Sequence, residues 1–271
     1  MARSIPKPDP QAIREYLDTA VSVAEAAGPI ALRYFRNTLD VEDKSAGAAF
    51  DPVTRADKEI ESSIRADLER LFPDHGILGE EEAERESDSP YRWVIDPIDG
   101  TRAFISGLPA WGILLGLTID GDCLAGVMHQ PYLGETFLGG AGEAWIRRAG
   151  KEEAIRTRPT SELDSAILYC THPSMFERDK DRQAFERVAN KSRMMRFGGD
   201  CYSYCLLAHG QIDLIVEGGL KPYDIIPLIP IIEGAGGIVT DWQGGGASGG
   251  GLIIAAANSE LHLQALEALN A

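Results

Sequence analysis

A strongly apolar segment that ends in two carboxylates constrains this chain more than any other feature. Trp93, Val94 and Ile95 have the composition of a buried strand, and Asp96 and Asp99 follow at once. Two carboxylates at the end of a buried strand repel each other and raise each other's pKa unless a cation lies between them. The segment therefore predicts a hard divalent ion with oxygen ligands. Mg2+ fits, because it keeps several waters and needs few protein carboxylates.

The two residues that follow suit an anionic ligand. Gly100 lets the backbone approach a ligand closely, and Thr101 offers a hydroxyl and a backbone N–H at an expected helix start, where phosphate is favoured. A purely structural alternative stays open, in which Asp96 closes a turn and Thr101 caps a helix. An isolated D-x-x-D-G-T segment does not decide between the two interpretations.

Two further carboxylates stand at similar boundaries. Glu80 follows a short apolar run at residues 76–79, and Asp224 directly precedes a strongly apolar run at residues 225–228. Each has a structural alternative of its own: Glu80 also begins a solvated acidic stretch, and Asp224 also suits the N-cap of a helix. Taken together, the acidic boundary residues indicate a site built from distant parts of the chain.

The periodicity of apolar residues changes along the chain and predicts the α/β (α+β) fold class. Helical spacing covers residues 13–35, with a kink or break expected near Pro29, and returns over residues 54–71. Short strands dominate after residue 91, including a hairpin around Asp120, Gly121 and Asp122. From about residue 160 strands and helices alternate. We therefore expect an α+β part over residues 1–150, which carries most of the metal ligands, and an α/β part over residues 151–271.

The charge balance excludes several kinds of protein. Asp and Glu number 42 against 26 Lys and Arg, so the net charge is -16, and bulk nucleic-acid binding is not expected because it requires a basic face. The apolar runs are shorter than the roughly 20 residues of a membrane helix, so no membrane association is expected. The N-terminus lacks the apolar core of a secretory signal, which predicts a cytoplasmic location. Cys201 and Cys205 stand one helical turn apart, which permits metal binding but favours buried free thiols.

Several motifs occur in a characteristic order. They lie at residues 44–45, 51–57, 79–81, 93–101, 223–224 and 234–237. In this combination the chain resembles the inositol monophosphatase superfamily of Mg2+-dependent phosphomonoesterases over nearly its whole length. The resemblance implies a layered αβαβα sandwich of the sugar-phosphatase type, a homodimer, and a small-molecule phosphate monoester as substrate.

The resemblance also implies two to three Mg2+ ions and the residues that hold them. Glu80, Asp96 and the carbonyl of Ile98 would bind one ion. Asp96, Asp99 and Asp224 would bind another, and a third, weaker ion would share Glu80.

Further residues receive catalytic and substrate-binding roles from the same resemblance. Asp57 and Thr101 would together orient the water that attacks phosphorus, with Glu80 as the third catalytic group, and Lys44 would lie near the outer waters of the metals. The implied substrate contacts are Gly100, Thr101, Asp200, Glu217 and Asp224.

The segment around Asp200 indicates the substrate. Inositol monophosphatases usually have Gly-Thr-Ala here, whereas this chain has Gly199 and Asp200 at the last two positions. A carboxylate in this wall, with Glu217 as a second acid, suits an amine or imidazolium better than a polyhydroxylated ring. Asp200 also suits a helix cap, and Tyr204 a packing role.

Together with residues 100–104 and 221–230, this segment looks like the histidinol-phosphate phosphatases of the superfamily. The expected reaction is therefore hydrolysis of L-histidinol phosphate to L-histidinol and phosphate in histidine biosynthesis. The alternatives are an inositol-1-monophosphatase, a broad-specificity sugar phosphatase, or a catalytically silent relative that binds a phosphorylated metabolite or a partner protein.

Overall fold

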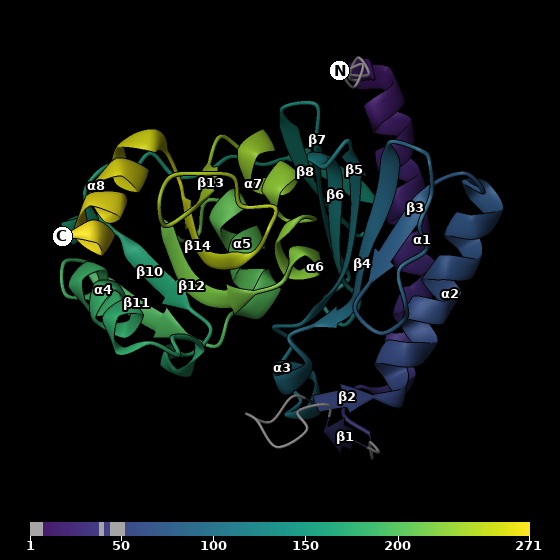
Figure 1. Cartoon of the computed structure of the whole chain (residues 1–271), viewed down its shortest axis with the longest axis horizontal. Coiled ribbons are helices and arrows are strands. Elements are labelled where there is room, and N and C mark those ends of the chain that lie inside the picture. The colour runs from purple at the N-terminus through teal and green to yellow at the C-terminus, as the bar shows by residue number, and fades with distance from the viewer. Residues whose placement is uncertain (1–7, 38–40, 44–51) are drawn as a thin grey trace.

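Two β-sheets alternate with three layers of helices in this protein, in the order αβαβα (Figure 1). The computed structural model describes residues 8–37, 41–43 and 52–271. Lys44 lies outside the described residues. The layering confirms the α/β sandwich that the resemblance implied. Among the described residues, no helix combines the length and the apolar character that a bilayer crossing requires.

The outer layer on one side consists of α1 (Pro10–Tyr34) and α2 (Arg55–Leu71), which cover one face of the larger sheet (Figure 1). Asp9 caps α1 by accepting a hydrogen bond from the N–H of Ala12 at 2.9 Å. The helix continues through Pro29 and does not end there, so the break that we considered is absent. The hairpin of β1 (Val41–Asp43) and β2 (Pro52–Thr54) leads into α2.

The larger sheet has seven strands in chain order. They are β3 (Gly76–Gly79), β4 (Tyr91–Asp99), β5 (Gly112–Ile119), β6 (Asp122–Gln130), β7 (Glu135–Gly140), β8 (Glu143–Arg148) and β9 (Lys151–Ala154). Only β3 and β4 are parallel, and the predicted hairpin joins β5 to β6. Because β9 pairs with β8, the sheet continues past residue 150, where the domain boundary was predicted.

The smaller sheet has five strands in the order β11-β10-β12-β14-β13. They are β10 (Ile167–Cys170), β11 (Met194–Phe197), β12 (Leu214–Leu220), β13 (Ile238–Asp241) and β14 (Gly251–Ala256). Helices α4 (Asp179–Ala189) and α8 (Ser259–Asn270) cover its outer face, and α5 (Asp200–Ala208), α6 (Pro222–Ile225) and α7 (Ile229–Gly234) lie between the sheets (Figure 1). A short helix, α3 (Thr101–Ile105), follows β4, and single 3-10 turns cover Leu163–Ser165 and Pro173–Met175.

Glycines in the larger sheet allow the segment after α6 to lie directly on its backbone. A Cβ atom at Gly126 of β6 would stand 1.8 Å from the carbonyl oxygen of Pro227, and one at Gly139 of β7 would stand 2.3 Å from that of Pro230. Side chains of any size at these positions would push the segment away from the sheet. The glycines therefore set the position of α6, which carries Asp224.

Replacing Gly126 by Ala is expected to lower the free energy of unfolding by about 1–3 kcal/mol, the usual cost of overpacking. Turnover should fall as well, because α6 must shift to admit the methyl group. Urea denaturation and a phosphate-release assay measure the two effects. Gly246→Ala is the matched control, since a Cβ there meets no atom within 4 Å. Equal stability of the two variants would contradict the close approach.

Candidate active site

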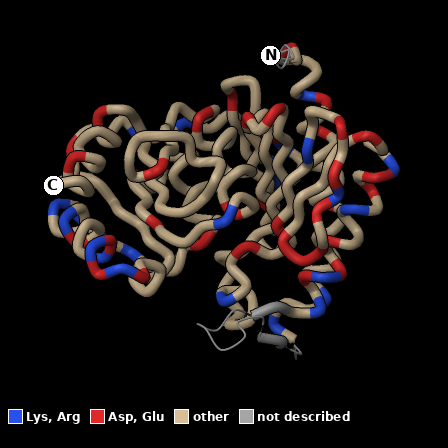
Figure 2. Tube along the Cα trace, viewed as in Figure 1, with Lys and Arg blue, Asp and Glu red and all other residues tan. Residues whose placement is uncertain are grey.

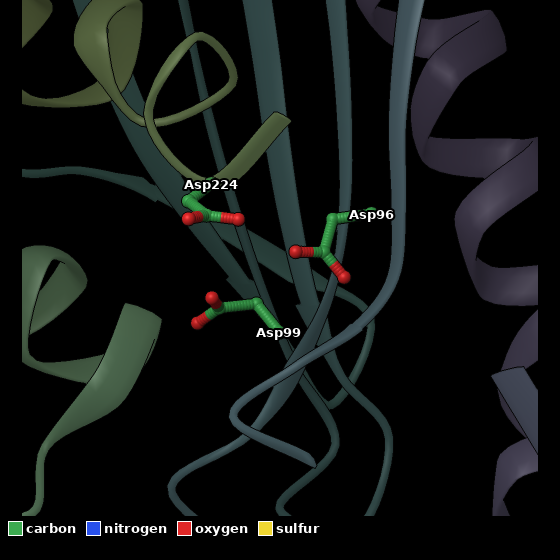
Figure 3. Close-up of side chains that lie close together, drawn as sticks. All are labelled: Asp96, Asp99 and Asp224. Atoms are coloured by element: carbon green, nitrogen blue, oxygen red, sulfur yellow. The ribbon is translucent and has the colours of Figure 1, made fainter. Parts of the chain in front are cut away.

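Three carboxylates from two distant segments face a common space between the sheets (Figure 3). Asp96 and Asp99 come from β4, and Asp224 comes from α6. One oxygen from each lies within 4.8 Å of the other two, which is the spacing that a shared cation requires. Asp96 is almost fully buried, with 2% of its surface exposed, and the other two are half-buried.

A strand irregularity brings the first two carboxylates together. The prediction that the strand ends at Ile95 is wrong: β4 continues to Asp99, and its register against β5 shifts between Asp96 and Asp99. In a regular strand, residues three apart point to opposite faces. The shift removes that constraint, as bulges do near active sites, and both carboxylates reach the same space. The N–H of Ile98 donates to Asp96 Oδ1 at 3.1 Å and orients this side chain.

The ionised forms of the carboxyl groups in this space are destabilised by burial and by mutual repulsion. Burial raises the pKa of Asp96 well above its usual value, and the charges of Glu80, Asp99 and Asp224 raise it further. Burial and the charge of Asp224 likewise raise the pKa of Asp99 well above its usual value. Burial raises the pKa of Asp224 to about 6. A cation would relieve both the repulsion and the loss of solvation.

Glu80 lies near Asp96 because β3 and β4 are parallel neighbours, but its carboxylate is not one of the three that gather within 4.8 Å of one another. Gly79, the last residue of β3, is in register with Ile95 of β4, so Glu80 follows β3 at the level of Asp96. Glu80 is half-buried, and its charge is the largest electrostatic influence on the pKa of Asp96 after burial. The structure therefore separates Glu80 from the exposed acidic residues that begin at Glu82.

A buried ion pair on α2, which sequence reasoning missed, holds the turn that carries Glu80. Glu61 is fully buried, and its carboxylate accepts hydrogen bonds from the N–H groups of Glu81 and Glu82 at 2.8 and 3.1 Å. Arg65 donates to the same carboxylate at 2.8 Å. A Cβ at Gly79 would lie 2.0 Å from Glu61 Oε1, so only glycine permits this contact. The available signal was the spacing of four between two opposite charges that stand beside the apolar positions Ile60 and Ile64 of the helix.

Asp57 presents one free oxygen in a buried position. Its Oδ2 accepts hydrogen bonds from the N–H and the hydroxyl of Thr54 at 2.8 and 2.6 Å, and the first of these belongs to the capping box of α2. Its Oδ1 is buried and has no hydrogen-bond partner. Burial raises the pKa of Asp57 to about 6. An orphaned carboxylate oxygen beside the acidic cluster fits a place for a water or a cation.

Thr101 lies at the start of α3, and its hydroxyl donates to the carbonyl oxygen of Ile98 at 3.1 Å. The resemblance implied that Asp57 and Thr101 act as a pair, whereas here each bonds to a residue of its own segment. The Ile98 carbonyl, implied as a metal ligand, keeps a second lone pair for that purpose.

A cavity of about 110 Å3 lies beside the carboxylates, and Asp99, Asp224, Asp200 and Glu217 line it together. Asp200 is the first residue of α5, and the N-cap is Gly199, so Asp200 does not cap this helix as the alternative proposed. Its φ of 42° is in the left-handed region, which non-glycine residues seldom adopt outside functional or turn positions. A Cβ at Gly100 would stand 3.0 Å from the Asp200 Cβ, so Gly100 makes room for this side chain.

Glu217, on β12, is held from two sides. The N–H of Thr171 donates to Oε1 at 2.7 Å, and the hydroxyl of Tyr204 donates to Oε2 at 2.9 Å. Glu217 is 2% exposed, and burial raises its pKa. Tyr204 packs in the core, as expected, but its hydroxyl also fixes the orientation of this carboxylate.

The donor set suits Mg2+, because it consists of hard oxygen ligands with no nitrogen or sulfur at its centre. The nearby thiols of Cys201 and Cys205 are buried, and burial raises the pKa of both well above the usual value, which disfavours the thiolates that metals bind. The N–H of Cys201 instead donates to Asp99 Oδ2 at 2.7 Å and orients that carboxylate.

Acidic positions outnumber basic ones along the trace, and basic ones gather around α4 (Figure 2).

Comparison with known proteins agrees with this arrangement. Residues 12–271 match the model of the inositol monophosphatase family. The chain is 40% identical over 259 residues to the bifunctional phosphatase IMPL2, chloroplastic, of Arabidopsis thaliana, covering 92% of this chain and 73% of that protein. It is 33% identical over 229 residues to the histidinol-phosphatase of Chlorobaculum parvum, covering 84% and 86%.

A solved structure of an inositol monophosphatase from Zymomonas mobilis superposes with a TM-score of 0.84 at 38% identity, over 96% of this chain and 99% of that one. The matched region of the family model contains every site residue described above. Phosphatases of this family generally depend on metal ions, in keeping with the acidic cluster. The chain belongs to the inositol monophosphatase family.

Proposed function

We propose that this phosphatase hydrolyses L-histidinol phosphate and uses Mg2+ held by Glu80, Asp96, Asp99, Asp224 and the Ile98 carbonyl. The observation that carries the choice of substrate is the pair of acids, Asp200 and Glu217, in the cavity that Asp99 and Asp224 also line. The similarity to the histidinol-phosphatase of Chlorobaculum parvum supports the same choice.

The residues around the cluster suit attack by water on a phosphate ester. Bound divalent cations supply charge neutralisation for the phosphate oxygens and lower the pKa of water. The buried Oδ1 of Asp57, which has no hydrogen-bond partner, can accept a hydrogen bond from that water. Thr101 donates its proton to Ile98, so its oxygen is oriented to accept the second hydrogen bond of the water.

The two acids in the cavity suit a leaving group with a positive charge. Burial raises the pKa of Asp200 to about 7, and the charge of Glu217 adds to that shift. A protonated amine placed between these groups would stabilise both carboxylates, and they would stabilise the amine. A neutral polyol supplies no such charge and would leave the repulsion between Asp200 and Glu217 in place. The pair therefore favours histidinol phosphate over inositol phosphate.

The test compares kcat/KM for L-histidinol phosphate and inositol 1-phosphate in the presence of Mg2+. We expect a preference for histidinol phosphate, and Asp200→Ala should reduce its kcat/KM by at least about tenfold, the usual cost of breaking a buried charge pair. Inositol phosphate turnover should not fall in the same variant. Glu153→Ala, at an exposed position of β9, is the control.

Two outcomes would contradict the proposal. A preference for inositol phosphate that Asp200→Ala does not alter would assign the chain to inositol monophosphatase activity, as the similarity to the Zymomonas mobilis enzyme allows. Absence of phosphate release from either ester, with and without Mg2+, would indicate a relative that only binds.

A further inference from the structure

A second cavity adjoins the one beside the metal cluster. Its volume is about 310 Å3, and it shares the walls formed by Thr171 and Asp200 with the first cavity. The remaining lining residues are Arg102, Ala103, Ser106, Leu108, His172, Ser174 and Gly198. They come from the α3 region and from the loops after β10 and β11, so the two sheets contribute one wall each.

The first cavity is too small for a whole amino alcohol ester. Its volume is about 110 Å3. This is well below the roughly 300 Å3 at which cavities begin to enclose whole small molecules. In the proposed function, a phosphate group with its cations and their waters would occupy much of this space. The distal part of the leaving group must therefore pass beyond Asp200.

Of the two cavities that adjoin the first, the one beyond Asp200 fits a small organic ring better. The other, of about 590 Å3, is reached past Met175 and Leu220 and is lined by four charged side chains: Glu177, Arg178, Asp181 and Lys221. The cavity beyond Asp200 is smaller and has a more apolar wall, and its volume falls in the range of pockets that enclose small molecules.

The walls of this second cavity match a flat ring that carries nitrogen atoms. Leu108 lies at its rim with 56% of its surface exposed, so its side chain is available for contact with a ligand in this cavity. His172 accepts a hydrogen bond from the N–H of Ser174 at Nδ1, 3.1 Å away, so the ring proton is on Nε2. The cavity thus offers an apolar contact and a fixed N–H donor.

We propose that the cavity lined by Leu108 and His172 receives the imidazole ring of the leaving group and that these two residues determine specificity. This inference rests on the proposed function, because it takes the phosphate to lie at the metal cluster and the amine to lie near Asp200. It adds the part of the substrate that lies beyond the amine, and it assigns roles to residues outside the acidic site.

The test uses two esters that differ only in the ring: L-histidinol phosphate and 2-aminopropyl phosphate, which keeps the phosphate and the amine. Leu108→Trp fills the second cavity and should lower the ratio of kcat/KM for histidinol phosphate to that for 2-aminopropyl phosphate by at least about tenfold. His172→Ala removes the N–H donor and should lower the same ratio. Because His172 is exposed, this change leaves the core packing unaltered. Leu263→Trp is the matched control, since this leucine is 58% exposed on α8 at the far side of the smaller sheet.

A binding measurement gives a readout that does not depend on turnover. In saturation-transfer NMR with L-histidinol, the ring protons should receive saturation from the wild-type protein and lose it in Leu108→Trp. An unchanged kcat/KM ratio in both variants, or equal loss for both esters, would overturn the ring cavity while leaving the proposed function intact. If the wild-type protein hydrolyses inositol phosphate and not histidinol phosphate, the proposed function itself fails.

Discussion

Replacement of Asp96 by Asn is expected to abolish turnover and, at the same time, to raise the melting temperature of the metal-free protein. Asp96 is the most buried of the three clustered acids, and the charges of Glu80, Asp99 and Asp224 all act against its ionisation. Loss of this ligand removes several kcal/mol of stabilisation that bound metal gives the transition state, and about 4 kcal/mol corresponds to roughly a thousandfold in rate.

The gain in stability has the same origin as the loss of activity. Asparagine keeps the size of the side chain and the oxygen that accepts the N–H of Ile98, but it removes a buried negative charge. Because the pKa of Asp96 is raised well above its usual value, removal of this charge relieves a penalty that the folded protein carries when no metal is bound. The increase should appear in calorimetry with a chelator present.

Two comparisons make the result for Asp96→Asn specific. Asp224→Asn should behave in the same way, because its carboxylate faces the same space (Figure 3). Asp164→Asn, at an exposed position before the smaller sheet, should change neither quantity. Near-normal turnover in Asp96→Asn or Asp224→Asn would disprove the proposed metal ligation, and a lower melting temperature without metal would contradict the electrostatic strain.

The layers of the fold followed from periodicity because most elements are strongly amphipathic or strongly apolar. The spacing of Ile60, Ile64 and Leu68 predicted α2, and all three are buried against the larger sheet. The hairpin between β5 and β6 followed from its turn residues, and both Asp120 and Gly121 have positive φ. Local signals of this kind need no knowledge of distant residues.

The arrangement of the side chains inside the site depends on contacts between distant segments of the chain, and no local sequence pattern predicts such contacts. The extension of β4 to Asp99 is a property of its register against β5, so the apolar run alone placed the end of the strand too early. The role of Glu61 and Arg65 depends on the turn after β3 packing against α2. Asp200 has a left-handed backbone and lies close to Gly100, which is 100 residues away in the chain. Sequence motifs identified the acidic residues of the site, but tertiary contacts determine which groups each of them faces.

Mg2+ is expected to stabilise the protein strongly at pH 8 and only weakly at pH 5. In the metal-free protein, burial raises the pKa of Asp57 and Asp224 to about 6, above the usual values of carboxyl groups. The folded state therefore holds protons more tightly than the unfolded chain, so this contribution is complete below about pH 4 and is lost as the pH rises through about 6. Metal binding requires the deprotonated carboxylates, so the metal competes with protons and binds best where the metal-free protein is least stable.

The size of the effect follows from linkage between binding and folding. At a concentration of Mg2+ about a hundred times its dissociation constant, binding stabilises the folded state by about 2.7 kcal/mol. For a chain of this length that corresponds to a rise in melting temperature of about 5 °C. Calorimetry of the chelated protein with and without added Mg2+, at pH 5 and at pH 8, measures the difference. Asp96→Asn should lose the increment at pH 8, because it removes the ligand that both proposed ions share. A shift of equal size at the two pH values, or none at pH 8, would show that the clustered carboxylates are not the groups that bind the metal.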